Sequence, residues 1–121
     1  MATAWVVDDD REMCEAMGLM LRLLGYAPRA FFDARSAAKA LLAGERPDLV
    51  LLDLNMPEVG GDDLLEFIRS RQRWQNIPVV MLTSEFAETE QARLLQLGAN
   101  GYLTKPVTLE ELQDVLSQLF R

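Results

Sequence analysis

The chain has 121 residues, half of them hydrophobic, and a net charge of −7 from 19 acidic and 12 basic residues. We therefore expect one compact domain over residues 1–121, and the negative charge argues against direct binding to nucleic acid or to an anionic membrane surface. Because the chain lacks histidine and has a single cysteine, Cys14, a Ser-His-Asp or Cys-His catalytic centre, a histidine-bound zinc ion and an internal disulfide are excluded.

Short apolar runs alternate with segments of helical spacing along the whole chain. In chain order the pattern predicts strand 4–7, helix 13–24, strand 27–32, helix 37–42, strand 49–52, helix 62–68, strand 78–82, helix 92–97, strand 102–103 and helix 109–120. Strict alternation of this kind predicts an α/β domain with a parallel sheet, right-handed crossovers and helices on both faces.

Several local signals support these boundaries. Pro28 lacks an N–H group, which favours an edge position for strand 27–32. Asp33 is a typical N-cap for the helix that follows it, and Thr108 with Glu111 forms a capping box before the last helix. Glycines follow three of the predicted helices, at Gly25, Gly44 and Gly98.

Polar residues that could bind a ligand follow the first, third, fourth and fifth predicted strands. They are Asp8, Asp9 and Asp10 after the first strand, Asp53 after the third, Thr83 and Ser84 after the fourth, and Thr104 and Lys105 after the fifth. In open parallel sheets, ligands bind outside the carboxyl ends of the strands, at the point where the strand order reverses. If the order reverses between the first and third strands, Asp8, Asp9 and Asp53 lie together.

Three clustered carboxylates repel one another unless a cation lies among them. Oxygen ligands without histidine or cysteine suit Mg²⁺, which also seeks phosphate oxygens. Asp10 is better explained as an acid in the first helical turn, and Cys14 as a small core residue. Lys105 and the Thr83 hydroxyl could hold a phosphoryl group beside the metal, and carboxylates are known nucleophiles for phosphoryl groups.

Four motifs, read together, resemble the receiver domain of two-component response regulators over essentially the whole chain. They are "VVDDD" (6–10), "LVLLDLNMPEVGG" (49–61), "PVVMLTS" (78–84) and "GYLTKPV" (101–107). The resemblance implies a CheY-like, flavodoxin-like fold, a doubly wound (βα)5 domain with strand order 2-1-3-4-5.

The resemblance also implies a role for each residue of the acidic site. Asp53 would accept a phosphoryl group from the phosphohistidine of a sensor kinase or phosphotransfer protein. Asp9 would bind Mg²⁺ directly, Asp8 would act through water, and Asn55 would supply its backbone carbonyl. Lys105 would pair with the phosphoryl group.

Further positions would control the response to phosphorylation. Thr83 would be the switch hydroxyl and Tyr102 the aromatic that turns inward with it, although a packed core tyrosine explains Tyr102 equally well. Asn55 and Glu85 would set the phosphoryl lifetime, and this pair predicts rapid self-dephosphorylation. The Lys105–Pro106 bond would be cis.

The expected output surface is formed by the fourth helix, fifth strand and fifth helix of this family. No signal peptide or membrane-spanning run is seen, so we expect a cytoplasmic protein; the oligomeric state stays open. Three alternatives also remain. They are a flavodoxin-like electron carrier, a Mg²⁺-dependent phosphatase or phosphotransferase, whose motif Asp8 and Asp10 satisfy, and a phosphate-independent interaction module of receiver shape.

Overall fold

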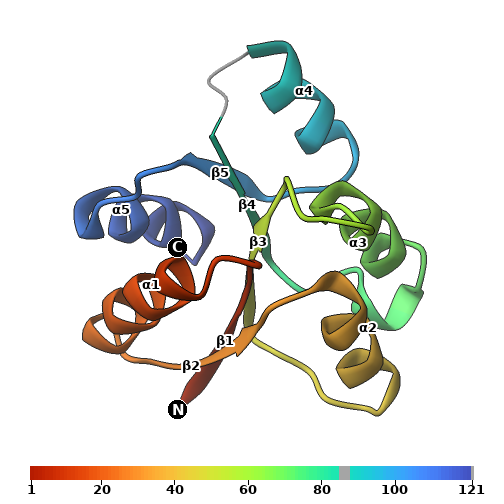
Figure 1. Cartoon of the computed structure of the whole chain (residues 1–121), viewed down its shortest axis with the longest axis horizontal. Helices are drawn as coiled ribbons and strands as arrows, with labels where there is room; N and C mark the ends of the chain where they lie inside the picture. Colours follow the sequence, from red (N-terminus) through yellow and green to blue (C-terminus); the bar gives the residue numbers. More distant parts are fainter. Residues whose placement is uncertain (85–87, 121) are drawn as a thin grey trace.

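A computed structural model describes residues 1–84 and 88–120, and within them five strands alternate with five α-helices (Figure 1). The elements are β1 (Ala2–Val7), α1 (Arg11–Leu23), β2 (Tyr26–Phe31), α2 (Ala34–Leu42), β3 (Leu49–Asp53), α3 (Gly61–Arg69), the 3₁₀ turn η1 (Gln72–Trp74), β4 (Val79–Thr83), α4 (Glu88–Gln96), β5 (Gly101–Thr104) and α5 (Leu109–Leu119). Every predicted strand and helix is present. The turn η1 was not predicted. Strand β1 and helix α1 begin two residues earlier than expected, and α4 begins four residues earlier.

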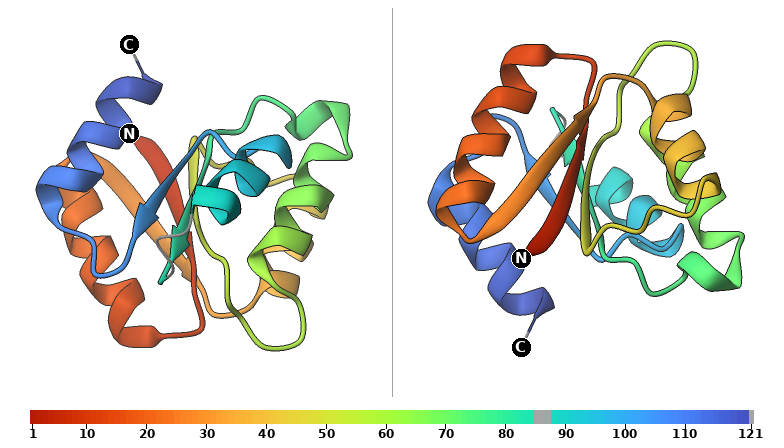
Figure 2. Two further views of the ribbon diagram at one scale, coloured as in Figure 1. Left: turned by 90° about the horizontal axis from the view of Figure 1, so that it is seen from above. Right: turned by 90° about the horizontal axis from the view of Figure 1, so that it is seen from below.

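The five strands form one parallel sheet in the order β2-β1-β3-β4-β5, which confirms the expected fold. Strand β2 is at an edge, as Pro28 indicated, and Pro28 lies opposite Ala4 of β1. The strand order reverses between β1 and β3, so the carboxyl ends of these neighbouring strands meet at one rim (Figure 2).

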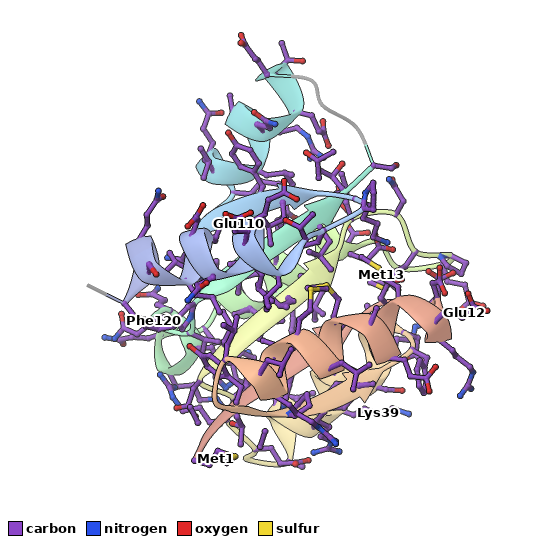
Figure 3. The ribbon with its side chains drawn as sticks, turned by 90° about the vertical axis from the view of Figure 1, so that its left-hand side faces the viewer. Met1, Glu12, Met13, Lys39, Glu110 and Phe120 are labelled. Carbon is purple, nitrogen blue, oxygen red and sulfur yellow. The ribbon has the colours of Figure 1, made fainter. Side chains whose placement is uncertain are left out.

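Two hydrophobic cores lie on the two faces of the sheet. Successive side chains of a strand point to opposite faces. In β3, Leu49 and Leu51 therefore pack in the core under α1 and α5, whereas Val50 and Leu52 pack in the core under α2, α3 and α4. Figure 1 shows this division, and Figure 3 views the face of α1 and α5, with Glu110 and Phe120 marking the two ends of α5. Burial on both faces explains the unbroken apolar run of β3.

Capping residues fix the helix starts next to the strand ends. Asp10 caps α1, accepting hydrogen bonds from the N–H groups of Glu12 and Met13 at 3.0 and 3.2 Å. It is therefore the N-cap itself, one residue before the first turn. Asp33 caps α2, and the predicted capping box opens α5. Three helices are followed by glycines with positive φ, Gly25, Gly44 and Gly98.

Among the described residues, none of the helices has the length and apolar character that crossing a lipid bilayer requires.

Candidate functional site

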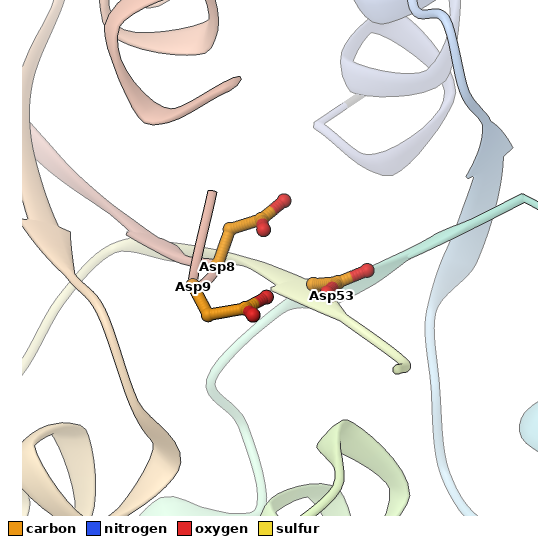
Figure 4. Close-up of side chains that lie close together, drawn as sticks. All are labelled: Asp8, Asp9 and Asp53. Carbon is orange, nitrogen blue, oxygen red and sulfur yellow. The ribbon is translucent and has the colours of Figure 1, made fainter. Parts of the chain in front are cut away.

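Three carboxylates meet at the rim where β1 and β3 end. Val7 of β1 lies opposite Leu52 of β3, so the residues that follow them emerge side by side. One oxygen each from Asp8, Asp9 and Asp53 can be chosen so that all three lie within 4.8 Å of one another. Figure 4 shows the Asp9 carboxylate directed toward Asp53, with Asp8 beside it. The structure thus brings together the acidic cluster expected from the strand order.

Asp8 is held rigidly beneath the surface. Its side chain is fully buried, and both of its carboxylate oxygens accept hydrogen bonds. Oδ1 accepts from the backbone N–H of Asp10 at 3.0 Å, and Oδ2 accepts from Nζ of Lys105 at 2.8 Å. The thiol of Cys14 donates to the Asp8 carbonyl oxygen at 3.3 Å. These contacts fix the position of Asp8 and leave exposed Asp9 as the more accessible carboxylate.

Lys105, which directly follows the edge strand β5, contacts two members of this acidic cluster. Its Nζ lies 2.8 Å from Asp8 Oδ2 and 3.0 Å from Asp53 Oδ1, and its backbone N–H donates to the Thr83 carbonyl at 2.8 Å. Burial acts to lower the pKa of Lys105, but the hydrogen bonds to the two carboxylates outweigh it and the pKa is raised. The ammonium group is therefore charged, and the Lys105–Pro106 bond that follows is cis, as expected.

Asp53 ends β3 with only 4% of its surface exposed. Burial and, secondarily, the negative charge of Asp8 raise the pKa of Asp53, although a hydrogen bond from Lys105 opposes the rise. A hydrogen bond from the Asn55 backbone also acts to lower the pKa of Asp53. One ammonium group facing three carboxylates leaves a negative site lined by oxygen ligands. This donor set fits a hard divalent cation such as Mg²⁺.

The other predicted residues lie on β4 and β5. Thr83 is fully buried at the carboxyl end of β4, next to the strand that bears Asp53. Tyr102 pairs with Met81 and packs, partly buried, against the core under α2, α3 and α4. Glu85 lies outside the described residues, so its predicted role in phosphoryl lifetime stays a prediction.

Gly61 also shapes the site, although the sequence did not predict this role. A β-carbon built on Gly61 would lie 2.0 Å from the carbonyl oxygen of Asp53 and 3.0 Å from Cα of Leu54. The Gly61 N–H also donates to the Leu54 carbonyl at 3.0 Å. Only glycine permits α3 to begin this close to the strand end that carries Asp53. The "GG" pair at 60–61 was the available signal, but the contact it serves is between distant parts of the backbone.

Cys14 lies in the core under α1, as predicted. Burial, with a smaller effect of the negative charge of Asp8, raises the pKa of its thiol to about 11. At neutral pH the thiolate is therefore scarce, which argues against a nucleophilic cysteine.

Comparison with known proteins gives a consistent result. The family described as the response regulator receiver domain matches residues 4–117. The chain is 33% identical over 115 residues to the chemotaxis protein CheY of Pseudomonas aeruginosa, covering 95% of this chain and 93% of that protein. It is 37% identical over 116 residues to the response regulator MprA of Mycolicibacterium vanbaalenii and to the transcriptional regulatory protein TctD of Salmonella typhimurium, but spans only 49% and 50% of their lengths.

Solved structures show the same likeness. The structure of CheY4 from Vibrio cholerae superposes with a TM-score of 0.89 at 30% identity, covering 99% of both chains. The bacteriophytochrome response regulator RtBRR superposes with a TM-score of 0.87 at 30% identity, covering all of this chain and 79% of that one.

Proposed function

The chain belongs to the response regulator receiver domain family of two-component signalling, and on that premise we propose that Asp53 accepts a phosphoryl group from a phosphohistidine. The donor would be a sensor histidine kinase or a phosphotransfer protein. The proposal rests on one observation. Asp8, Asp9 and Asp53 lie close together at one rim of the sheet, and Lys105 forms ion pairs with Asp8 and Asp53. We propose that this transfer takes place in the cytoplasm, as expected from the sequence.

Each residue of the site has a chemical task in this transfer. An Asp53 carboxylate oxygen forms a bond to phosphorus while the bond from phosphorus to the donor's histidine nitrogen breaks. Lys105, already 3.0 Å from Asp53, is placed to neutralise charge on the phosphoryl oxygens. Asp8, Asp9, Asp53 and the Asn55 carbonyl would hold Mg²⁺, which when bound supplies further positive charge at the same oxygens.

Phosphorylation would act as a conformational switch. The new phosphoryl group brings negative charge and hydrogen-bond acceptors to the end of β3, next to the buried Thr83 hydroxyl on β4. Movement of Thr83 toward it, in step with Tyr102, would shift the population of conformations on the surface of α4, β5 and α5. An output protein or domain would read that surface. The Asn55 and Glu85 pair would favour rapid self-dephosphorylation.

Intact mass spectrometry after incubation with acetyl phosphate and Mg²⁺ tests the proposal. We expect the protein to gain the mass of one phosphoryl group, and the gain to disappear in EDTA and in Asp53→Asn. The matched control is Asp48→Asn, because Asp48 is an exposed acid that directly precedes the amino end of the same strand. Full labelling of Asp53→Asn would contradict the assignment. Failure of the wild type to label would favour the phosphate-independent interaction module.

A further inference from the structure

A second charged feature lies at the end of the sheet opposite Asp53. From residue 67 to residue 84 the sequence contains three arginines and no acid, within a chain of net charge −7. Arg71 and Arg73 belong to the segment around η1, which leads into the amino end of β4, and Arg46 lies in the loop that leads into the amino end of β3 (Figure 1). These exposed residues, Arg46, Arg71 and Arg73, are called the arginine surface below.

The arginine surface rests on a buried aromatic base. Trp74 is only 3% exposed, and its ring centroid lies 5.2 Å from that of Phe67. The guanidinium carbon of Arg73 lies 4.6 Å from the Trp74 centroid, and that of Arg71 lies 5.5 Å from it. Arg46 donates a hydrogen bond to the Arg73 carbonyl, which ties the two loops together. These contacts favour one arrangement of the guanidinium groups before any partner binds.

A fourth arginine, Arg69, turns inward and makes the base rigid. It donates to the carbonyl oxygens of Gly98, Trp74 and Ile77 at 2.9, 3.3 and 2.9 Å, and to the Asn100 side chain at 2.8 Å. It thereby clamps the segment around η1 between α3 and the approach to β5. The surface arginines differ from Arg69 because each of them is an exposed residue, whereas Arg69 is partly buried.

Within residues 1–84 and 88–120, no carboxylate forms an ion pair with the arginine surface. In the part of the chain that the structure describes, ion pairs to carboxylates are made by Arg29, Arg35, Arg93 and Lys105, and by none of the three surface arginines. The nearest acids along the chain are Glu45, which pairs with Arg29, Asp48, which accepts hydrogen bonds from Thr3, and Glu66. Three neighbouring cations that have no carboxylate partner among the described residues favour the binding of an anion.

We propose that the arginine surface binds a short acidic segment of a partner protein. The planar guanidinium group matches a carboxylate with two parallel hydrogen bonds, and groups fixed beforehand lose less entropy on binding. A long polyanion fits less well, because duplex nucleic acid or an anionic membrane would extend beyond the patch and meet a protein of net charge −7. Since the patch lies at the opposite end of the strands from Asp53, binding is independent of phosphorylation and can anchor the domain to its partner.

Titration with a hexaglutamate peptide at low ionic strength, followed by ¹H–¹⁵N correlation spectra of the full chain, tests this inference. We expect shifts confined to residue 46 and residues 69–76, with the same affinity in Asp53→Asn. The double variant Arg71→Gln/Arg73→Gln should bind about tenfold or more weakly, and Arg46→Gln severalfold more weakly. The matched control is Arg11→Gln/Arg22→Gln, which removes the same charge from α1 and should change the affinity by less than about twofold. Unchanged spectra elsewhere show that each variant is folded.

Three results would overturn the proposal. One is equal weakening by the α1 control, which would mean that only net charge matters. Another is tighter binding of a DNA duplex or of phosphatidylserine vesicles to the same residues. The third is a dimer in sedimentation that the Arg71→Gln/Arg73→Gln variant abolishes, because the surface would then serve a second copy of this chain.

Discussion

Replacing Asp53 by asparagine should stabilise the metal-free protein. Asp53 is almost fully buried, its carboxylate lies within 4.8 Å of two others, and a single ammonium group lies 3.0 Å away. The raised pKa of Asp53, caused first by burial, means that ionising this side chain costs free energy in the folded state. The isosteric asparagine removes that charge and can still accept a hydrogen bond from Lys105.

The charges of the site set the size of the effect. At an effective dielectric constant of about 20, each neighbouring carboxylate repels Asp53 by about 3–4 kcal/mol, and Lys105 attracts it by about 5–6 kcal/mol. Water screens the repulsion between exposed Asp9 and Asp53, whereas the burial of Asp53 adds a free-energy cost to its ionised form. We expect Asp53→Asn to raise the free energy of unfolding by about 1–2 kcal/mol, which is several degrees in Tm for a domain of this size.

The effect depends on pH and on Mg²⁺ in a defined direction. Because the pKa of Asp53 is raised in the folded state, the contribution of this side chain to stability is fully present below the ordinary carboxyl pKa of about 4. That contribution is lost as the pH rises through the folded-state pKa. The gain from Asp53→Asn should therefore be small at acidic pH and complete at neutral pH. Saturating Mg²⁺ should stabilise the wild type more than the variant and so shrink the gain.

Urea unfolding followed by circular dichroism in EDTA measures this effect, with Asp48→Asn as the control of equal charge change. A wild type more stable than Asp53→Asn in EDTA at neutral pH would refute the electrostatic reasoning. An equal rise in the free energy of unfolding in Asp48→Asn would also refute it, because the stabilisation would then come from the change in net charge.

Three further predictions follow from single contacts. Gly61→Ala should lower the free energy of unfolding by about 2–4 kcal/mol and slow labelling by acetyl phosphate, because the new methyl group meets the Asp53 backbone. The control Gly60→Ala should have a smaller effect, because the closest neighbour of Gly60 is a movable side-chain oxygen of Asp62. Equal unfolding midpoints of the two variants would contradict this. Glu58 has a φ of 67°, so Glu58→Asn should raise the free energy of unfolding by about 0.5–1 kcal/mol and move the urea midpoint to a higher concentration. A lower midpoint would refute the strain. Iodoacetamide at pH 8 should modify Cys14 far more slowly in the folded protein than in urea; similar rates would contradict its buried, high-pKa state.

The sequence was sufficient for the fold and for the acidic rim because both depend on local signals. Apolar runs marked the strands, and the polar residues directly after them, such as Asp8, Asp53 and Lys105, had to emerge at the carboxyl edge of a parallel sheet. Once the strand order was supplied by the resemblance, their convergence followed from topology.

Features that depend on contacts between distant segments could not be predicted. The Gly61 requirement arises from the approach of α3 to the backbone of Asp53, and η1 is held by Arg69 through carbonyl groups that reach as far along the chain as Gly98. The glycine pair at 60–61 marks the position but not its distant contact, and the Arg69 contacts have no periodic or compositional signature. The double hydrogen bonding of Lys105 was likewise unpredicted, because side-chain direction is set by packing at the rim.

The most direct test of the account identifies the residue that carries phosphorus. Borohydride reduces an aspartyl phosphate to homoserine, so reduction after acetyl phosphate treatment, followed by peptide sequencing in a mass spectrometer, locates the acceptor. We expect homoserine at position 53 alone, and only when Mg²⁺ is present. Homoserine at position 8 would instead support a phosphatase-like nucleophile at the end of β1 and would contradict the account.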